Sequence, residues 1–243
     1  MAQIQEEAIP REVMEGLRER LEGDERIELF VRLLLEENER QNLVSRGEAS
    51  PARLRQHVLD SASSLFLLED LPEGSRVADV GSGNGLPGIV LACLAEGLKF
   101  SLVESVSRKC RFLERAAQRL ALGHVRVLNV RSEELAAEER ESFDLALARA
   151  LAPFEVACEL LSPLVKVGGK VVLYKGPGLA EEMEGKLGLA SYLGLSAPKV
   201  WRYELEGGAR YLAVMDKVSP CPVGVPRRPG MAGKRPLRIG KGG

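Results

Sequence analysis

Residues 76–88 of the chain read RVADVGSGNGLPG, and this stretch decides the fold. A short apolar run leads to Asp79, glycines follow at every second position from Gly81 to Gly85, and Pro87 stands where the first turn of a helix tolerates proline. This order predicts a strand, a tight turn and a helix. Because glycine has no side chain, such a turn lets a nucleoside lie directly on the backbone.

Two classes of ligand use such a turn. Residues 83–88 fit the GxGxxG pattern of dinucleotide-binding proteins, so NAD is one alternative. Asp79, two residues before the first glycine, extends the pattern to D-x-G-x-G-x-G, which resembles the first motif of class I S-adenosylmethionine (SAM) methyltransferases. A dinucleotide needs a helix N-terminus that is free to bind a pyrophosphate anion. An acid suits the ammonium of SAM better, so SAM is favoured over NAD and over a packing turn without ligand.

A second acid follows at the end of the next strand. Residues 99–104 are predicted to form a strand that ends in Glu104. A carboxylate fixed at this position can accept hydrogen bonds from ribose hydroxyls. The alternative is a solvated loop acid. The glycine turn and Glu104 together predict a site for an adenosine ribose.

Composition predicts a globular protein of a reducing cytoplasm. The 243 residues contain no apolar run long enough to span a membrane and begin without a signal-peptide pattern. The cysteines are scattered without CxxC spacing, which argues against a zinc site and a disulfide framework: Cys93, Cys110, Cys158 and Cys221. We expect no metal, no membrane partner and a self-sufficient monomer.

Charge is distributed unevenly along the chain. Residues 1–50 carry thirteen acids and seven bases, whereas seven lysines and arginines and no acid follow Asp216. This basic end is rich in Pro and Gly, which predicts either a solvated, disordered tail or an arm that contacts phosphates and orders on its RNA. The candidate RNA-binding cations of this tail are Arg227, Arg228, Lys234 and Arg235.

Hydrophobic periodicity places the other elements. Helices are predicted at 10–21, 25–38 and 51–69, the last with Ser50 as N-cap and Pro51 in its first turn. Strands are predicted at 76–80, 99–104, 125–130, 143–148 and 169–174, with helices at 87–96, 107–121, 153–165 and 178–190. Residues 198–205 and 209–216 are predicted to form a β-hairpin.

These elements predict an α/β fold with a seven-stranded, mainly parallel sheet that ends in a β-hairpin. Such a sheet is the Rossmann-like arrangement of class I SAM methyltransferases and is not typical of dinucleotide-binding dehydrogenases. The expected organisation has three parts: an N-terminal helical extension over 1–70, a SAM-binding domain over 71–218 and a basic tail over 219–243.

An ordered series of motifs resembles one family. The series is HVLDS at 57–61, GNGLPG at 83–88, KCRFL at 109–113, SFD at 142–144, ARA at 148–150, YKG at 174–176 and RRPG at 227–230. From about residue 42 to 237 the chain resembles the glucose-inhibited division protein B family, whose members use SAM to methylate N7 of a guanine in bacterial 16S ribosomal RNA. Glu104 stands where that family often has Asp, which is a mild departure.

The resemblance implies roles for individual residues. The expected cofactor contacts are Asp79, Gly81, Gly83, Gly85, Leu86, Glu104, Ser132, Glu133 and Arg149. Arg149 and Lys175, which follow two buried strands, are expected to contact SAM, guanine O6 or RNA phosphate, and form the candidate catalytic pair. Ser132 as a helix N-cap and Arg149 in a surface ion pair are the structural alternatives. His57 is a candidate RNA contact, or packs locally with Asp60.

The expected mechanism needs little acid–base chemistry. Guanine N7 carries a lone pair and no proton, so the enzyme has to hold N7, methyl carbon and sulfur in line. Residues 149–153 lack the Asn/Asp-Pro-Pro-aromatic run of amino methyltransferases. The expected partner is 16S rRNA, in the small ribosomal subunit or its precursor. Another RNA, a small molecule or protein substrate, an NAD-dependent oxidoreductase and a catalytically silent SAM-binding module are the alternatives.

Overall fold

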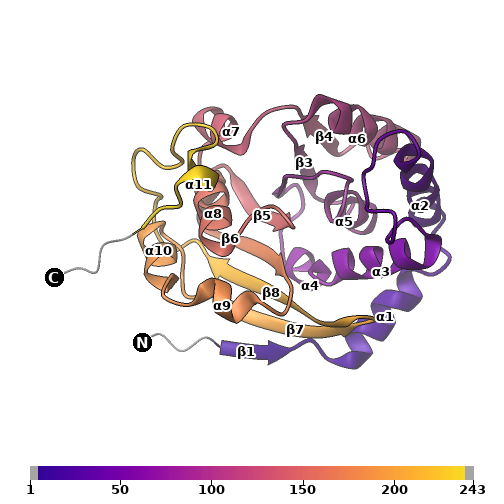
Figure 1. The fold of residues 1–243 in the computed structure, drawn as a ribbon, viewed down its shortest axis with the longest axis horizontal. Helices are drawn as coiled ribbons and strands as arrows, with labels where there is room; N and C mark the ends of the chain where they lie inside the picture. The colour runs from indigo at the N-terminus through magenta and orange to yellow at the C-terminus, as the bar shows by residue number, and fades with distance from the viewer. Residues whose placement is uncertain (1–4, 239–243) are drawn as a thin grey trace.

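The structure of this protein is a computed structural model, which describes residues 5–238. Its strands are β1 (Gln5–Ala8), β2 (Arg76–Val80), β3 (Lys99–Val103), β4 (Val125–Leu128), β5 (Phe143–Arg149), β6 (Val165–Lys175), β7 (Lys199–Leu205) and β8 (Gly208–Asp216). They form one sheet in the order β1-β7-β8-β6-β5-β2-β3-β4 (Figure 1). Only β8 runs antiparallel to its neighbours, β6 and β7. The predicted class of fold is therefore confirmed, including the closing hairpin.

The sheet has eight strands where the sequence predicted seven. The additional strand is β1, which forms one edge of the sheet and pairs in parallel with β7. It belongs to the N-terminal segment that was predicted to be helical only. Its sequence QEEA is mostly exposed and has no apolar alternation. The pairing depends on backbone hydrogen bonds, which leave no periodic signal in the sequence.

Helices cover both faces of the sheet (Figure 1). One face packs against α1 (Arg11–Leu21), α2 (Glu25–Asn38), α3 (Pro51–Ala62), α4 (Leu65–Glu69), α5 (Gly88–Leu94) and α6 (Ser107–Arg119). The other packs against α7 (Ser132–Glu138), α8 (Phe154–Leu161), α9 (Leu179–Met183) and α10 (Leu187–Tyr192). The short helix α11 (Met231–Lys234) contacts α8. Strand β5 illustrates the alternation, because Leu145 and Leu147 face the first layer while Ala146 and Ala148 face the second.

The helix predicted over 51–69 is two helices. Ser50 accepts a hydrogen bond from the amide of Arg53, so the predicted N-cap is confirmed. The helix ends after Ala62, where the hydroxyl of Ser63 donates to the carbonyl of Asp60 and the hydroxyl of Ser64 bonds to Tyr174. Serine side chains that compete for backbone partners favour such a break. Next to the break, Asp60 and Ser61 in the last turn of α3 bond to Arg149 of β5 and Tyr174 of β6.

The basic tail packs on the protein as far as the structure describes it. Cys221 and Val225 are buried in the core layer that also contains α8, and Ala232 is buried on α11, which contacts α8. The tail therefore differs from the solvated, disordered segment predicted as one alternative, because its apolar residues have a face of α8 to cover. Across residues 5–238 no helix is both long and apolar enough to span a bilayer, and no group of side chains could hold a metal ion.

Candidate cofactor and substrate site

The glycine turn after β2 has a conformation that requires glycine. Gly81, Gly83 and Gly85 all have positive φ angles, of 74°, 53° and 88°. A Cβ atom on Gly81 would lie 2.6 Å from Cδ1 of Leu151, and one on Gly85 would lie 2.9 Å from Ile89. The turn ends at Pro87, and α5 begins at Gly88, one residue later than predicted.

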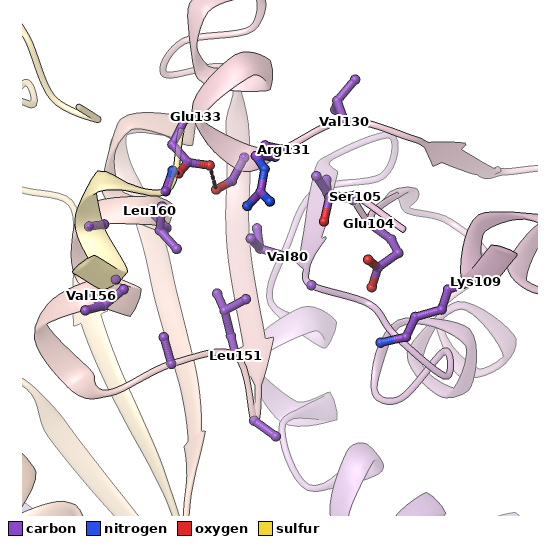
Figure 2. Close-up of a pocket in the computed structure, with 18 residues that line it drawn as sticks. Val80, Glu104, Ser105, Lys109, Val130, Arg131, Glu133, Leu151, Val156 and Leu160 are labelled. Atoms are coloured by element: carbon purple, nitrogen blue, oxygen red, sulfur yellow. Dashed lines mark hydrogen bonds between the residues drawn. The ribbon is translucent and has the colours of Figure 1, made fainter. Parts of the chain in front are cut away.

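A cavity of about 390 Å³ opens beside this turn, at the carboxyl ends of β2, β3 and β5 (Figure 2). Glu104 and Lys109 lie on one side, and Val156 and Leu160 of α8 lie on the other. The predicted contacts Gly81, Glu104, Ser132 and Glu133 all line it. Arg131, expected beside Ser132 and Glu133 over the adenine, lines it as well. The lining residues that were not predicted are Val80, Val103, Ser105, Lys109, Val130, 150–152, Val156, Leu160, Gly230, Ala232 and Gly233.

Glu104 ties the end of β3 to the glycine turn. The residue is buried, with 6% of its surface exposed. One carboxylate oxygen accepts a hydrogen bond from the amide of Gly83 at 3.0 Å, and the other accepts from the amide of Val106 at 2.8 Å. An ionised carboxylate has about four acceptor positions, so it can take further donors from a ligand. The alternative of a solvated loop acid is wrong.

Ser132 and Glu133 open helix α7 at the far end of the cavity. Arg131 occupies the N-cap position, and its amide donates to the Glu134 side chain at 2.9 Å. The alternative of Ser132 as N-cap is therefore wrong, because Ser132 is the first helical residue. Its hydroxyl lies 3.4 Å from one oxygen of Glu133, whose other oxygen accepts from the amide of Gly230 at 2.9 Å.

Asp79 lies beneath the turn and does not line the cavity. It is 1% exposed, and one carboxylate oxygen accepts from the amide of Gly88 at 3.1 Å. The other oxygen has no hydrogen-bond partner within residues 5–238. Burial raises the pKa of Asp79 from 3.8 to about 7. Its position makes Asp79 a cap for α5, and the predicted direct contact with the cofactor has no support from this geometry.

Gly83, Gly85 and Leu86 also lie outside the lining of the cavity. Leu86 is 4% exposed and belongs to the core, and Gly85 faces Phe30 and Leu113. These residues shape the turn from behind. Of the predicted cofactor contacts, those that reach the cavity are Gly81 and Glu104 after β2 and β3, and Ser132 and Glu133 at the start of α7.

A second cavity of about 390 Å³ adjoins the first. Residues 150–152 line both cavities and so form the partition between them. The predicted residues Arg149 and Lys175 line only the second one, with Asp60, Pro153, Tyr174, Gly176, Glu182 and Arg210. Arg149 was predicted to contact the cofactor as well, and the structure places it on the other side of the partition.

Arg149 is held by a chain of side chains from distant segments. Its Nε donates to Asp60 at 2.7 Å, and an Nη donates to Nδ1 of His57 at 2.8 Å. Tyr203 donates to the second oxygen of Asp60 at 2.7 Å, and His57 Nε2 lies 2.9 Å from Glu48. The ion pair of Arg149 is thus largely buried, with side chains 18% and 8% exposed, so the alternative of a surface ion pair is wrong.

The side chain of His57 accepts a hydrogen bond from Arg149 and forms none with Asp60 within residues 5–238. A ring that accepts at Nδ1 carries its proton on Nε2, where it donates to Glu48. Burial, followed by the positive charge of Arg149, lowers the pKa of His57 below 6.5. Both expectations for His57 need correction: no local pair with Asp60 forms, and its Nδ1 and Nε2 are both engaged within the protein, which leaves no ring nitrogen for RNA.

Lys175 connects the partition at 150–152 to Glu182 through hydrogen bonds. Its Nζ donates to the carbonyl of Ala152 at 2.9 Å and to Glu182 at 2.5 Å. Glu182 also accepts from the amide of Phe154 at 2.9 Å. The Lys175 side chain is only 9% exposed. Lys175 therefore positions residues 152–154 and borders the second cavity at the same time.

One predicted RNA contact of the tail is engaged within the protein. Arg227 forms an ion pair with Glu159, which is completely buried. This pairing corrects the assignment of Arg227 to RNA, because its guanidinium is already bound. Arg228, Lys234 and Arg235 make no ion pair within residues 5–238.

Comparison with known proteins decides the family. The model of the rRNA small subunit methyltransferase G family (GidB) matches residues 24–200. The chain belongs to this family. A relative of that name from Carboxydothermus hydrogenoformans is 40% identical over 221 residues, which cover 88% of this chain and 92% of the relative. Another from Moorella thermoacetica is 39% identical over 216 residues, which cover 87% and 89%.

Solved structures of more distant methyltransferases agree with the fold. An O-methyltransferase from Thermotoga maritima has a TM-score of 0.53 at 19% identity, over 67% of this chain and 66% of that one. A geranyl diphosphate methyltransferase in complex with SAM has a TM-score of 0.50 at 19% identity, over 72% and 94%. These two likenesses support a class I methyltransferase fold.

Family membership makes SAM the cofactor, and the NAD alternative is wrong. The first cavity fits SAM by the chemistry of its walls. Gly81 leaves the backbone open, Glu104 offers free acceptor positions for hydroxyl donors, and Val80, Val156 and Leu160 supply apolar surface for an adenine ring. The same residues would hold SAM, which supplies the methyl group when bound.

The raised pKa of Asp79 predicts a pH dependence of the free energy of unfolding. A carboxyl group whose pKa is higher in the folded state binds more protons there than in the unfolded state. The free energy of unfolding of the wild type should therefore fall, relative to that of Asp79→Asn, as pH rises from about 4 to about 7, by up to about 1.4 kcal/mol per pH unit. Urea unfolding across this range measures the difference. Asp79→Ala, which loses the bond to Gly88, is the control and should be less stable than Asp79→Asn at every pH.

Proposed function

We propose that this protein transfers the methyl group of SAM to N7 of a guanine in 16S ribosomal RNA of the small ribosomal subunit. Membership in the family establishes a SAM-dependent rRNA methyltransferase. The choice of guanine N7 rests on the family resemblance. The observation that carries the proposal is the pair of cavities that meet at residues 150–152, with a polar, charged cavity next to the cofactor cavity.

The second cavity has the donors that a guanine edge needs. Guanine presents two acceptors on its major-groove edge, O6 and N7. In our proposal a cation donates to O6 and leaves N7 free toward the partition. Arg149 is the stronger candidate, because its guanidinium is fixed by Asp60 and His57. Lys175 and Arg210 border the same cavity and are candidates for a neighbouring phosphate.

The residues of this cavity need not move a proton. When bound, SAM supplies a methyl group that is activated by a positively charged sulfur. N7 has no proton to lose, and burial raises the pKa of Tyr174 well above its ordinary value of 10, so this phenol stays neutral. Methylation leaves a positive charge on the guanine ring. The second cavity also contains the carboxylates of Asp60 and Glu182. Their negative charges offset the positive charges of Arg149 and Lys175, so the cavity does not disfavour a positively charged guanine.

The RNA backbone would contact exposed cations near the two cavities. Arg228, Lys234 and Arg235 are all exposed. Lysine and arginine gain affinity for RNA by releasing counterions, so these contacts should weaken with salt. We assign phosphate contacts to these three residues and no longer to Arg227 or His57.

The proposal predicts one methylated guanine. Purified protein and SAM with a labelled methyl group are incubated with naked 16S rRNA, with small subunits and with their precursors, from cells that lack the gene. Label is expected at one guanine that becomes sensitive to the borohydride and aniline cleavage specific for 7-methylguanine. Label on an exocyclic amino group, or on protein and not RNA, would overturn the proposal. Comparing the three substrates identifies the assembly state that the enzyme prefers.

A further inference from the structure

The C-terminal segment, residues 221–235, runs beside the cofactor cavity. After β8 the chain runs along α8, and α11 lies next to that helix (Figure 1). Ala232 is 2% exposed and Val225 is 5% exposed, so the segment has a buried side. In Figure 2 this segment, in yellow, lies beside Val156 and Leu160, across the cavity from Glu104. The segment is thus part of the layer that encloses the site.

Three residues of the segment belong to the cavity wall. Gly230, Ala232 and Gly233 line the cavity together with Val156 and Leu160. The amide of Gly230 donates to Glu133 at 2.9 Å, and Gly230 has a φ angle of 78°, which favours glycine. Glu133 is itself a lining residue. The tail therefore forms one side of the cavity and also holds the carboxylate of Glu133 in place through a hydrogen bond.

The first anchor of the segment is Arg140. Its guanidinium donates to the carbonyls of Val225 at 2.6 Å, Cys221 at 2.8 Å and Pro222 at 3.1 Å. Glu141 adds a bond by accepting from the amide of Cys221 at 2.6 Å. These contacts hold the part of the segment that precedes the cavity wall.

The second anchor is a buried ion pair next to the wall. Arg227 donates to both carboxylate oxygens of Glu159, at 2.8 Å and 2.7 Å, and its amide lies 3.3 Å from the same side chain. Glu159 is 0% exposed and comes from α8. A buried carboxylate that loses its partner is strongly unfavourable, so this pair keeps the chain from leaving α8. Gly230 follows only three residues later.

We propose that residues 221–235 form one wall of the cofactor site, and that the Arg227–Glu159 ion pair positions this wall. In this arrangement Arg227 and Glu159 are positioning residues: they act through Gly230, Ala232 and Gly233, and do not touch the cofactor. One side of the basic tail thus contributes to SAM binding. The cations Lys234 and Arg235 of the same segment are exposed to solvent. The inference concerns SAM alone and does not depend on which RNA is methylated.

The first test measures SAM binding without RNA. Arg227→Met is expected to raise the dissociation constant for SAM at least tenfold in isothermal titration calorimetry, and Glu159→Gln should act in the same direction. Arg227→Lys keeps the charge but not the fork of donors, and should recover part of the affinity. Arg119→Met, at an exposed position of α6 that lines neither cavity, is the control and should leave SAM affinity within twofold. Unchanged SAM affinity in a folded Arg227→Met variant would overturn the proposal.

Kinetics separates positioning from general loss of structure. In the RNA methylation assay, Arg227→Met should raise KM for SAM while kcat and KM for RNA stay near those of the wild type. A merely destabilised protein would lose kcat through a smaller active fraction, with KM for SAM unchanged, and this outcome would contradict the proposal.

A measurement on the wild type avoids the variants altogether. Amide hydrogen exchange of residues 227–235 is expected to slow at least tenfold when SAM saturates the protein, because the wall closes on the ligand. Exchange at residues 199–216, in the hairpin away from the cavity, is the internal control. Unaltered exchange over 227–235 under saturating SAM would show that the segment is not part of the site.

Discussion

Arg149→Ala is expected to lower kcat for methyl transfer by about 100- to 1,000-fold while SAM affinity changes little, because losing a fixed donor at the reacting group typically has this effect. Arg149 lies on the far side of the partition from the cofactor cavity, so its loss removes the group that orients the base and leaves the cofactor walls intact. Single-turnover kinetics with the RNA substrate, together with calorimetry for SAM, separates the two effects.

The variant also breaks a buried ion pair, so its stability has to be followed. Asp60 is left without its cation, at a cost of about 3–5 kcal/mol in the free energy of unfolding. The double variant Arg149→Ala with Asp60→Asn removes that charge and should regain stability without regaining activity. Arg126→Ala is the matched control, since Arg126 pairs with Glu139 away from both cavities. Near-normal kcat in the stable double variant would remove Arg149 from the reaction.

Glu104→Ala is expected to weaken SAM binding by about 100-fold, because hydrogen bonds to a charged group contribute about 1.5–3 kcal/mol each and tenfold in affinity corresponds to about 1.4 kcal/mol. The variant loses the proposed acceptor for the ribose hydroxyls. It also leaves the amides of Gly83 and Val106 without their acceptor, so the glycine turn loses its attachment to β3. Titration calorimetry of SAM against the folded variant measures the loss.

Two further variants define the contribution of the charge. Glu104→Gln keeps one carbonyl acceptor and should bind SAM with an affinity between those of the wild type and Glu104→Ala. Glu114→Ala removes an exposed acid from α6 and should bind SAM as the wild type does. An affinity of Glu104→Ala within twofold of the wild type would show that the carboxylate does not hold the ribose.

The sheet and its main ligand-binding turn could be predicted because their signals are local. Buried parallel strands appear as short apolar runs, and each strand end is marked by the residue that follows it, such as Glu104 after β3. The positive φ angles at Gly81, Gly83 and Gly85 restrict those positions to glycine in the sequence itself. These features predicted the class of fold, the topology of the hairpin and part of the first cavity.

Predictions about side-chain partners were less accurate. Asp79 was expected to meet the cofactor, but its side chain turns inward to Gly88. His57 and Asp60 share one helix face, which suggested a local pair, but both bind Arg149, some ninety residues later in the chain. A pattern along one helix shows which residues share a face and does not show what that face will meet.

The sequence by itself determined seven of the eight strands, the glycine turn and the acid that follows β3, since periodicity and backbone torsion act over a few neighbouring residues. Only the tertiary structure decided that QEEA becomes an eighth strand, that Arg149 lies in a separate cavity and that Arg227 pairs with Glu159. Each of these depends on groups that lie far apart in the chain and meet only after folding. A buried charge is stable only when the folded chain brings a partner to it, as Glu159 meets Arg227. The function of the basic tail could therefore not be predicted from its composition.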